Sequence, residues 1–194
     1  MSMTHVMVDI ETLGTSCDAP ILTIGAIVFD PVTGVVGATF YEKIDVRCYG
    51  ELSNLFSVSY ETLVWWMEQN EAARKEAFIG ENRRHLRNVL TTFHEWLTVN
   101  SDNVRADTER KSLYMWSHGK DFDLIILSYA LSVFGITVPW RFWETRDTRT
   151  IYDMAGVKLR KEPNALEHEL HHALGDCSRQ IEGVVQAYKI LKRK

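Results

Sequence analysis

The chain opens with three stretches in which β-branched and apolar residues predominate. His5–Glu11, Ile21–Asp30 and Val35–Ile44 each have the length and composition of a β-strand, and the turn residues Pro31 and Gly34 separate the last two. Because the connections between them are short, the three strands are predicted to pair as an antiparallel meander.

Helical spacing replaces this pattern in the middle of the chain. Ser59 is a candidate N-cap for a helix that carries Leu63, Trp66 and Met67. Residues Arg83–Leu97 form a stronger helical pattern, because their apolar residues recur at intervals of three and four. Two helices are therefore expected before the polar residues that follow.

A second strand-and-helix pattern follows the polar stretch Asn100–Lys111. Ser112–Trp116 is predicted to be a fourth strand, and Phe122–Phe134 a helix that ends at Gly135, a residue suited to a helix C-terminus. The alternation of strands and helices predicts an α/β fold with a mixed β-sheet flanked by helices. Its first three strands are expected to be antiparallel and the later ones parallel.

Two more helices complete the predicted order. Asp147 is a candidate cap for a short helix through Asp153 that Gly156 closes, and Ala173–Leu191 is a long helix with one apolar side. The intervening Val157–His172 is predicted to be irregular. The length of 194 residues fits one domain that spans residues 1–194.

Composition narrows the class of protein. Of the residues, 45% are hydrophobic and 25% charged, as in globular proteins, and the sequence has no apolar run of the roughly 20 residues that span a bilayer. The N-terminus lacks the pattern of a secretory signal, and three widely spaced cysteines favour the reducing cytoplasm over a disulfide framework. A net charge of −4 excludes binding of nucleic acid by bulk charge alone.

Acidic residues provide the candidate chemistry. Asp9 and Glu11 lie two residues apart on a predicted strand, so both side chains point to the same face. Such a pair is costly to bury unless a cation neutralises it, although a solvated strand end explains the pair equally well. Asp123 opens a predicted helix, where a favourable helix dipole is the simpler explanation, and Asp176 lies near the buried boundary of the last helix.

The surroundings of these acids resemble a known family. Asp9-Ile10-Glu11-Thr12, Phe122-Asp123 and His171-x-Ala173-x-x-Asp176 are similar to the three motifs of the DEDDh 3′–5′ exonucleases. Further stretches resemble phage and prophage exonucleases grouped with a mycobacterial-type exoribonuclease. They are DIETLGT (9–15), ILTIGAIVFDPVTG (21–34), Trp65-Trp66, WSHGKDFDLIIL (116–127) and RDTRTIYDMA (146–155). The resemblance covers nearly the whole chain.

This resemblance implies an RNase H-like fold in which Asp9, Glu11, Asp123 and Asp176 hold two Mg²⁺ or Mn²⁺ ions. It also implies hydrolysis from the 3′ ends of single-stranded DNA or RNA, with release of nucleoside 5′-monophosphates. His171 is the implied general base, because the family's histidine precedes the aspartate by five positions. The neighbouring His172 competes for that role on sequence alone.

Several residues are candidate substrate contacts. Thr12 and Leu13 follow the metal pair, where similar enzymes contact the terminal nucleotide, and Phe122 is a candidate stacking residue. Core packing explains Phe122 at least as well. Trp65 and Trp66 are adjacent and cannot share a helical face, so we expect Trp66 in the core and Trp65 toward substrate.

Two further side chains are weaker candidates. Arg149 matches the arginine of the resembling RDTRT stretch and is expected either to hold a phosphate or to brace the fold. His118 is interpreted as strand-end structure or as a phosphate contact.

Other functions remain open on sequence alone. An RNase H-like endonuclease shares the fold, and a non-catalytic nucleic-acid-binding module would use the carboxylates structurally. The choice between DNA and RNA depends on contacts with the 2′-hydroxyl, which a motif does not reveal. No membrane partner is expected, and a homodimer is expected because related enzymes often form one.

Overall fold

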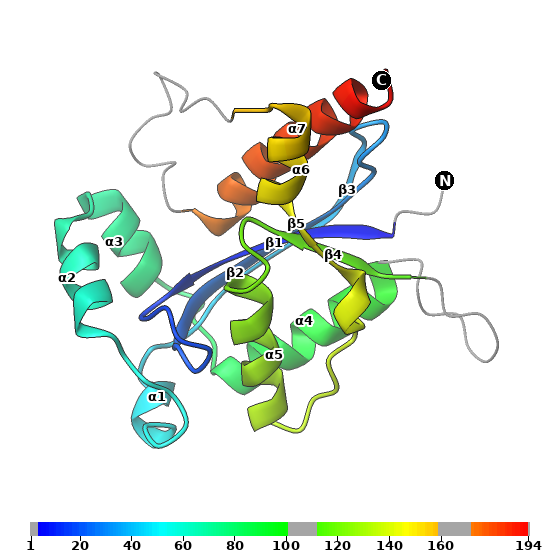
Figure 1. Cartoon of the computed structure of the whole chain (residues 1–194). Helices are drawn as coiled ribbons and strands as arrows, with labels where there is room; N and C mark the ends of the chain where they lie inside the picture. Colours follow the sequence, from blue (N-terminus) through cyan, green and yellow to red (C-terminus); the bar gives the residue numbers. More distant parts are fainter. Residues whose placement is uncertain (1–3, 101–111, 159–171, 194) are drawn as a thin grey trace.

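A five-stranded mixed sheet forms the centre of the computed structural model, which describes residues 4–100, 112–158 and 172–193 (Figure 1). The strand order is β3-β2-β1-β4-β5. The strands are β1 (His5–Thr12), β2 (Ile21–Phe29), β3 (Val36–Lys43), β4 (Tyr114–Ser117) and β5 (Thr145–Asp147).

The pairing directions confirm the predicted mixed sheet. β2 runs antiparallel to both β1 and β3, whereas β4 runs parallel to β1 and β5 parallel to β4. The carboxyl ends of β1, β4 and β5 therefore point the same way. In open α/β sheets this edge is where ligands bind.

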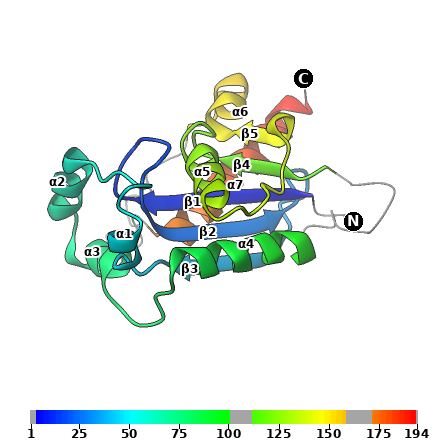
Figure 2. The ribbon, with the colours of Figure 1, turned by 90° about the horizontal axis from the view of Figure 1, so that it is seen from below.

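Helices cover both faces of the sheet (Figure 2). On one face, α4 (Leu86–Asn100) and α5 (Asp123–Val133) bury the side chains of alternate β1 residues, including Val8. On the other face, α6 (Thr148–Ala155) and α7 (Ala173–Leu191) pack over Met7. Burial on both faces explains why β2 is buried throughout and apolar except for Thr23.

Shorter elements surround this core. They are α1 (Cys48–Glu51), α2 (Tyr60–Glu68), α3 (Glu71–Phe78) and the 3₁₀ turn η1 (Phe142–Glu144). α2 and α3 lie at one end of the molecule in Figure 1, where Trp66 and Ala73 pack with Leu13. Among the described residues, no helix is long and apolar enough to cross a bilayer.

The predicted helix ends are largely confirmed. The Ser59 hydroxyl accepts a hydrogen bond from the N–H of Thr62 at 3.2 Å, so Ser59 caps α2. Asp147 caps α6, and α7 has the predicted bounds. Gly135 and Gly156 have φ angles of 66° and 69°, the left-handed conformation that a glycine permits after a helix.

The predicted start of one helix was wrong. α4 begins at Leu86 rather than Arg83, because the N–H of Arg84 donates to the carbonyl of Lys43 at 3.0 Å and holds that residue extended. In α2, Trp66 is buried, as expected, and Met67 is 69% exposed. The sequence analysis also missed α1, α3, η1 and β5, which are short.

The first turn of α7 lies directly on β2 at Gly25. A methyl group added to Gly25 would lie 2.6 Å from the carbonyl carbon of Ala173 and 2.7 Å from the nitrogen of Leu174. Only a glycine therefore allows this approach, which sets the height of α7 above the sheet.

We expect Gly25→Ala to lower stability by about 1–3 kcal/mol, because the helix must move away from the sheet. Thermal denaturation measures this as a lower Tm. Gly50→Ala is the matched control, since an added methyl group there meets nothing within 4 Å. Equal Tm values for the two variants would contradict the close packing at Gly25.

Candidate active site

Three carboxylates meet where β1 passes under the start of α7. Asp9 and Glu11 project from β1 on the face that α7 covers, and Asp176 lies in the first turn of α7. One carboxylate oxygen from each residue lies within 4.8 Å of the others. The sequence predicts this meeting, and the close packing of α7 on Gly25 brings Asp176 toward β1.

The fourth acid approaches from the opposite side of β1. Asp123 is the first residue of α5 and only 3% exposed. Its Oδ1 accepts a hydrogen bond from the N–H of Ile10 at 3.2 Å, so the carboxylate is fixed beside the residue between Asp9 and Glu11. All four predicted acids are therefore brought to one place.

Burial makes these negative charges unfavourable. It raises the pKa of Asp9 well above its usual range, and the charges of Asp123, Asp176 and Glu11 raise it further. Burial also raises the pKa of Glu11, with Asp176 and Asp123 adding to the effect. Desolvation raises the pKa of Asp123 to about 7, although the hydrogen bond from Ile10 opposes the shift. Such a cluster favours taking up either protons or cations.

The donor atoms fit Mg²⁺ and Mn²⁺. The cluster offers carboxylate oxygens, which are the ligands these hard cations prefer, rather than thiolates or several imidazoles. A divalent ion there would offset the desolvation and mutual repulsion that raise the pKa values.

Two residues of α7 that the sequence analysis missed also contact the acids. The Gln180 amide donates to Asp9 Oδ1 at 2.8 Å, and Arg179 forms an ion pair with Asp176. These residues follow Asp176 by four and three positions, so they share its side of the helix. This spacing was the available signal, but by itself it does not distinguish them from surface residues.

The predicted general base, His171, lies outside the described residues, so its role stays a prediction. Its neighbour His172 caps α7, because its Nδ1 accepts from the N–H of Gly175 at 3.4 Å. The His172 ring stacks on Tyr41 with 4.5 Å between centroids, and its Nε2 lies 3.8 Å from Glu76. These contacts indicate that His172 stabilises the start of α7.

His118 and Arg149 lie beside the loop that leads to Asp123. His118 Nδ1 is 2.8 Å from the hydroxyl of Thr148. Arg149 lies against Gly119, where an added methyl group would be 2.7 Å from Nη1 and where φ is +108°. Burial and the charge of Arg149 lower the pKa of His118. Both residues are thus near Asp123, as a role at the site requires.

The remaining candidates differ in accessibility. Thr12 is buried, its hydroxyl donates to the carbonyl of Gly14 at 2.6 Å, and its own carbonyl accepts from Trp66 Nε1 at 2.9 Å. Leu13 packs in the same cluster as Trp66. Trp65 is 39% exposed, as expected of the outer tryptophan.

Phe122 is partly buried against the core, which agrees with the packing interpretation as well as with a substrate contact. Its backbone N–H donates to the carbonyl of Gly119 at 2.9 Å and closes the turn before α5.

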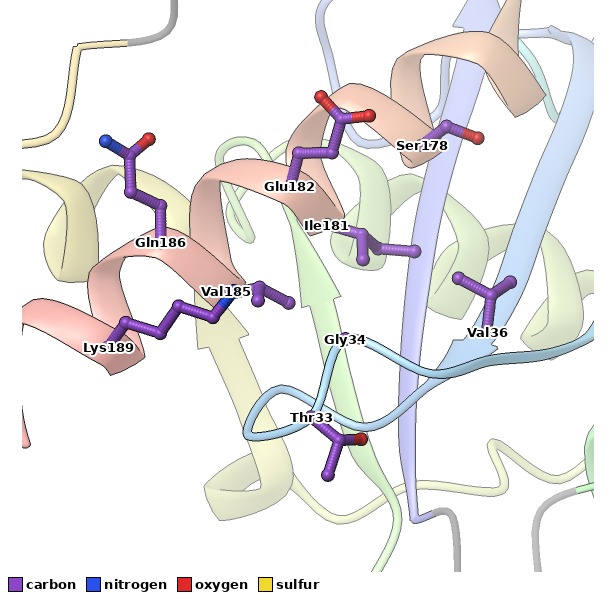
Figure 3. A pocket seen from close by; sticks show the side chains of 9 residues that line it. All are labelled: Thr33, Gly34, Val36, Ser178, Ile181, Glu182, Val185, Gln186 and Lys189. Carbon is purple, nitrogen blue, oxygen red and sulfur yellow. The ribbon is translucent and has the colours of Figure 1, made fainter.

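A separate groove of about 510 Å³ lies between α7 and the turn that joins β2 to β3 (Figure 3). Ile181, Val185 and Val36 form its apolar part, and Glu182 and Lys189 are among its polar residues. None of the four predicted acids lines it, so we do not assign it to the site.

The sequence itself matches the family described as the 3′-5′ exoribonuclease Rv2179c-like domain over residues 4–188. The chain belongs to this family. A relative, the exodeoxyribonuclease of Enterobacteria phage T4, is 26% identical over 204 residues, which cover 90% of this chain and 85% of that protein. The family and this relative indicate an exonuclease, a hydrolase of nucleic acids.

Solved structures support the RNase H-like exonuclease fold. Exonuclease I superposes with a TM-score of 0.64 at 14% identity over 97% of this chain, which spans only 41% of the length of that protein. The nuclease domain of 3′hExo, a DEDDh family member, gives 0.56 at 11% identity over 99% of this chain and 93% of its own. At such identities the likeness shows the fold alone.

We expect Asp123→Asn to stabilise the metal-free protein. The folded-state pKa of about 7 lies above the unfolded value near 3.9, so ionisation penalises the folded state increasingly as the pH rises between those values. Below pH 4 the acid is protonated in both states and the variant gains nothing from this source. Above pH 7 the gain is constant, about 1–4 kcal/mol.

Thermal denaturation with EDTA between pH 4 and pH 8 measures this difference. Mn²⁺ should reduce or reverse the stability difference, because the ion stabilises the unsubstituted protein more than it stabilises Asp123→Asn. A variant that is less stable than the unsubstituted chain at pH 8 in EDTA would contradict the electrostatic argument.

Proposed function

We propose that this chain removes nucleoside 5′-monophosphates one at a time from the 3′ end of single-stranded nucleic acid. Convergence of Asp9, Glu11, Asp123 and Asp176 is the observation that carries the proposal. Family membership supplies the direction and the reaction class. The new step is to assign the hydrolysis to these four side chains with divalent ions.

In this proposal, Asp9, Glu11, Asp123 and Asp176 hold two Mg²⁺ or Mn²⁺ ions. When bound, such ions would lower the pKa of the attacking water and stabilise the negative charge on the departing 3′ oxygen. Gln180 orients the Asp9 carboxylate through its 2.8 Å hydrogen bond. The same helix therefore supplies both Asp176 and the side chain that holds Asp9 in place.

We propose that His171 is the general base that accepts the proton of the attacking water. The water oxygen forms the new bond to phosphorus, the bond between phosphorus and the 3′ oxygen breaks, and the 3′ oxygen takes a proton from solvent. An imidazole with a pKa near 6.5 can accept a proton at neutral pH, whereas His172 is already engaged with Tyr41 and Gly175.

Neither sugar is excluded as substrate. The family is described as an exoribonuclease, whereas the phage relative is an exodeoxyribonuclease. Exonuclease I is known bound to a dT13 oligonucleotide, and 3′hExo bound to rAMP. We propose activity on single strands, because a terminal nucleotide must leave its duplex partner to reach the acids. A homodimer stays our proposal for the assembly.

The decisive experiment uses a 5′-labelled single strand with Mn²⁺, Mg²⁺ or EDTA. We expect a ladder that shortens by one nucleotide at a time with either ion and no cleavage with EDTA. Asp123→Asn should lower kcat at least about a hundredfold, because it removes one ligand charge. Paired DNA and RNA strands of the same sequence measure the sugar preference.

Different outcomes separate the alternatives. Internal fragments instead of a ladder would indicate an endonuclease. Binding without cleavage in the presence of fresh Mn²⁺ would indicate a non-catalytic module. Full activity of Asp123→Asn would contradict the assigned centre.

We expect His171→Ala to lower kcat about 10²–10⁴-fold with little change in metal affinity, because a general base accepts a proton and is not a ligand. A calorimetric titration with Mn²⁺ measures the metal affinity separately from turnover. His172→Ala is the neighbouring control and should act mainly on stability. Loss of Mn²⁺ affinity in His171→Ala would show a ligand role instead.

A further inference from the structure

Two aromatic side chains of η1 lie largely in solvent. Phe142 is 84% exposed and Trp143 is 55% exposed. Their rings meet edge to face, with 4.7 Å between centroids and an interplanar angle of 90°. Large exposed apolar side chains that cluster in this way mark interaction surfaces.

The turn that presents these rings is firmly held. Glu144 is fully buried, and its Oε2 accepts a hydrogen bond from the N–H of Arg141 at 2.7 Å. The N–H of Glu144 donates in return to the carbonyl of Arg141 at 2.9 Å. Because the backbone is fixed at both ends of η1, a ligand that stacks on the rings loses little binding energy to their ordering.

Positive charge accompanies the rings. The Arg141 guanidinium lies 5.3 Å from the centroid of the Trp143 ring. Arg146 donates to the carbonyl of Trp143 at 2.8 Å and lies 4.5 Å from the centroid of the Tyr114 ring. Aromatic faces interleaved with arginines suit the bases and phosphates of a single strand.

The same edge of the sheet leads from η1 toward the acids. β5 follows η1 and runs parallel to β4, with Arg146 opposite Trp116 and Asp147 opposite Ser117. A groove of about 440 Å³ lies along this edge, and Lys120, Arg146 and Met154 contribute to its lining. The distance from Trp143 to Asp147 is at most about 13 Å along an extended chain.

Basic side chains continue along this path to the candidate site. The backbone N–H of Lys120 donates to Asp147 Oδ2 at 3.2 Å, which joins the start of α6 to the loop before Asp123. The Lys120 ammonium forms an ion pair with Asp121 at 2.6 Å. Arg149 lies beside the same loop, with its guanidinium against Gly119. Arg149, Arg146 and Arg141 therefore place positive charge at intervals from beside the acids to η1, with Asp147 and Asp121 between them, although the whole chain carries a net charge of −4.

We propose that Phe142 and Trp143 form a stacking platform, with Arg141 beside it, for nucleotides upstream of the 3′ end of the substrate strand. Arg146 and the groove along β5 carry the intervening phosphates toward the acids. This inference rests on the proposed function, since the reaction supplies the strand. The arginines beside the platform favour an anionic ligand. The exposed rings favour a nucleic acid over an acidic peptide, because a peptide has no bases to stack.

Binding is tested in the Asp123→Asn background, so that the strand survives the measurement. Fluorescence anisotropy with a labelled single strand of about twelve nucleotides gives Kd for Phe142→Ala and Trp143→Ala. We expect about five- to a hundredfold weaker binding for each ring removed. Trp143→Phe, which keeps an aromatic face, should recover most of the loss.

Charge is tested separately. Arg141→Gln should reduce the slope of log Kd against log salt by about 0.7, the value for one phosphate contact on a single strand. Val99→Ala is the control for removing an exposed apolar side chain, because Val99 is 79% exposed at the end of α4. Its binding and salt slope should match those of the Asp123→Asn parent.

Turnover separates this inference from the proposed function. In the otherwise unsubstituted chain, the ratio of kcat/KM for the long strand to that for a dinucleotide should fall in Phe142→Ala and Trp143→Ala. An unchanged ratio, or a Kd within twofold of the parent, would overturn the platform and leave the exonuclease assignment intact. Absence of turnover on either substrate by the unsubstituted protein with Mn²⁺ would overturn the proposed function itself.

Self-association is the remaining outcome. Analytical ultracentrifugation of Phe142→Ala and Trp143→Ala measures whether the rings join two copies of the chain. A dimer that dissociates in these variants, with binding restored at concentrations that restore the dimer, would overturn the platform in favour of a subunit contact.

Discussion

Mutual repulsion among four clustered carboxylates is the constraint on which the site depends. Asp9 and Glu11 are fixed by the pairing of β1 with β2, where they lie opposite Gly25 and Thr23, so neither can move far from the other. Asp123 and Asp176 lie in the first turns of α5 and α7, where the helix dipole is positive and partly offsets their charge. The remaining unfavourable energy is what a divalent cation can relieve.

Close packing between α7 and β2 fixes the position of Asp176 relative to the acids of β1. Gly25 pairs with Asp9 across the sheet and lies beneath Ala173, so the helix start is held directly beside the β1 acids. Cys177, the residue after Asp176, is fully buried, and its thiol donates to the carbonyl of Gly25 at 3.4 Å. Small side chains at this contact thus keep Asp176 within reach of Asp9.

Local signals made the regular part of the fold predictable. Alternation and helical spacing identified β1 to β3, α5 and α7, and the caps at Ser59 and Asp147 located two helix starts. The elements that were missed depend on distant contacts. β5 has three residues and exists through its pairing with β4, and α3 is mainly polar and buries little beyond Ala73 and Ala77.

The site was predictable to a different extent. Alternation on β1 shows that Asp9 and Glu11 share a face, but no local rule brings Asp123 and Asp176 to them from 112 or more positions away. That meeting requires β1 between β2 and β4 and both helices to start at the same edge, so the family motifs carried the prediction. The contacts of Gln180 and Arg179 with the acids could not be predicted for the same reason. Their spacing places them beside Asp176, but only the assembled sheet shows that Asp9 lies within hydrogen-bonding distance of that side of α7.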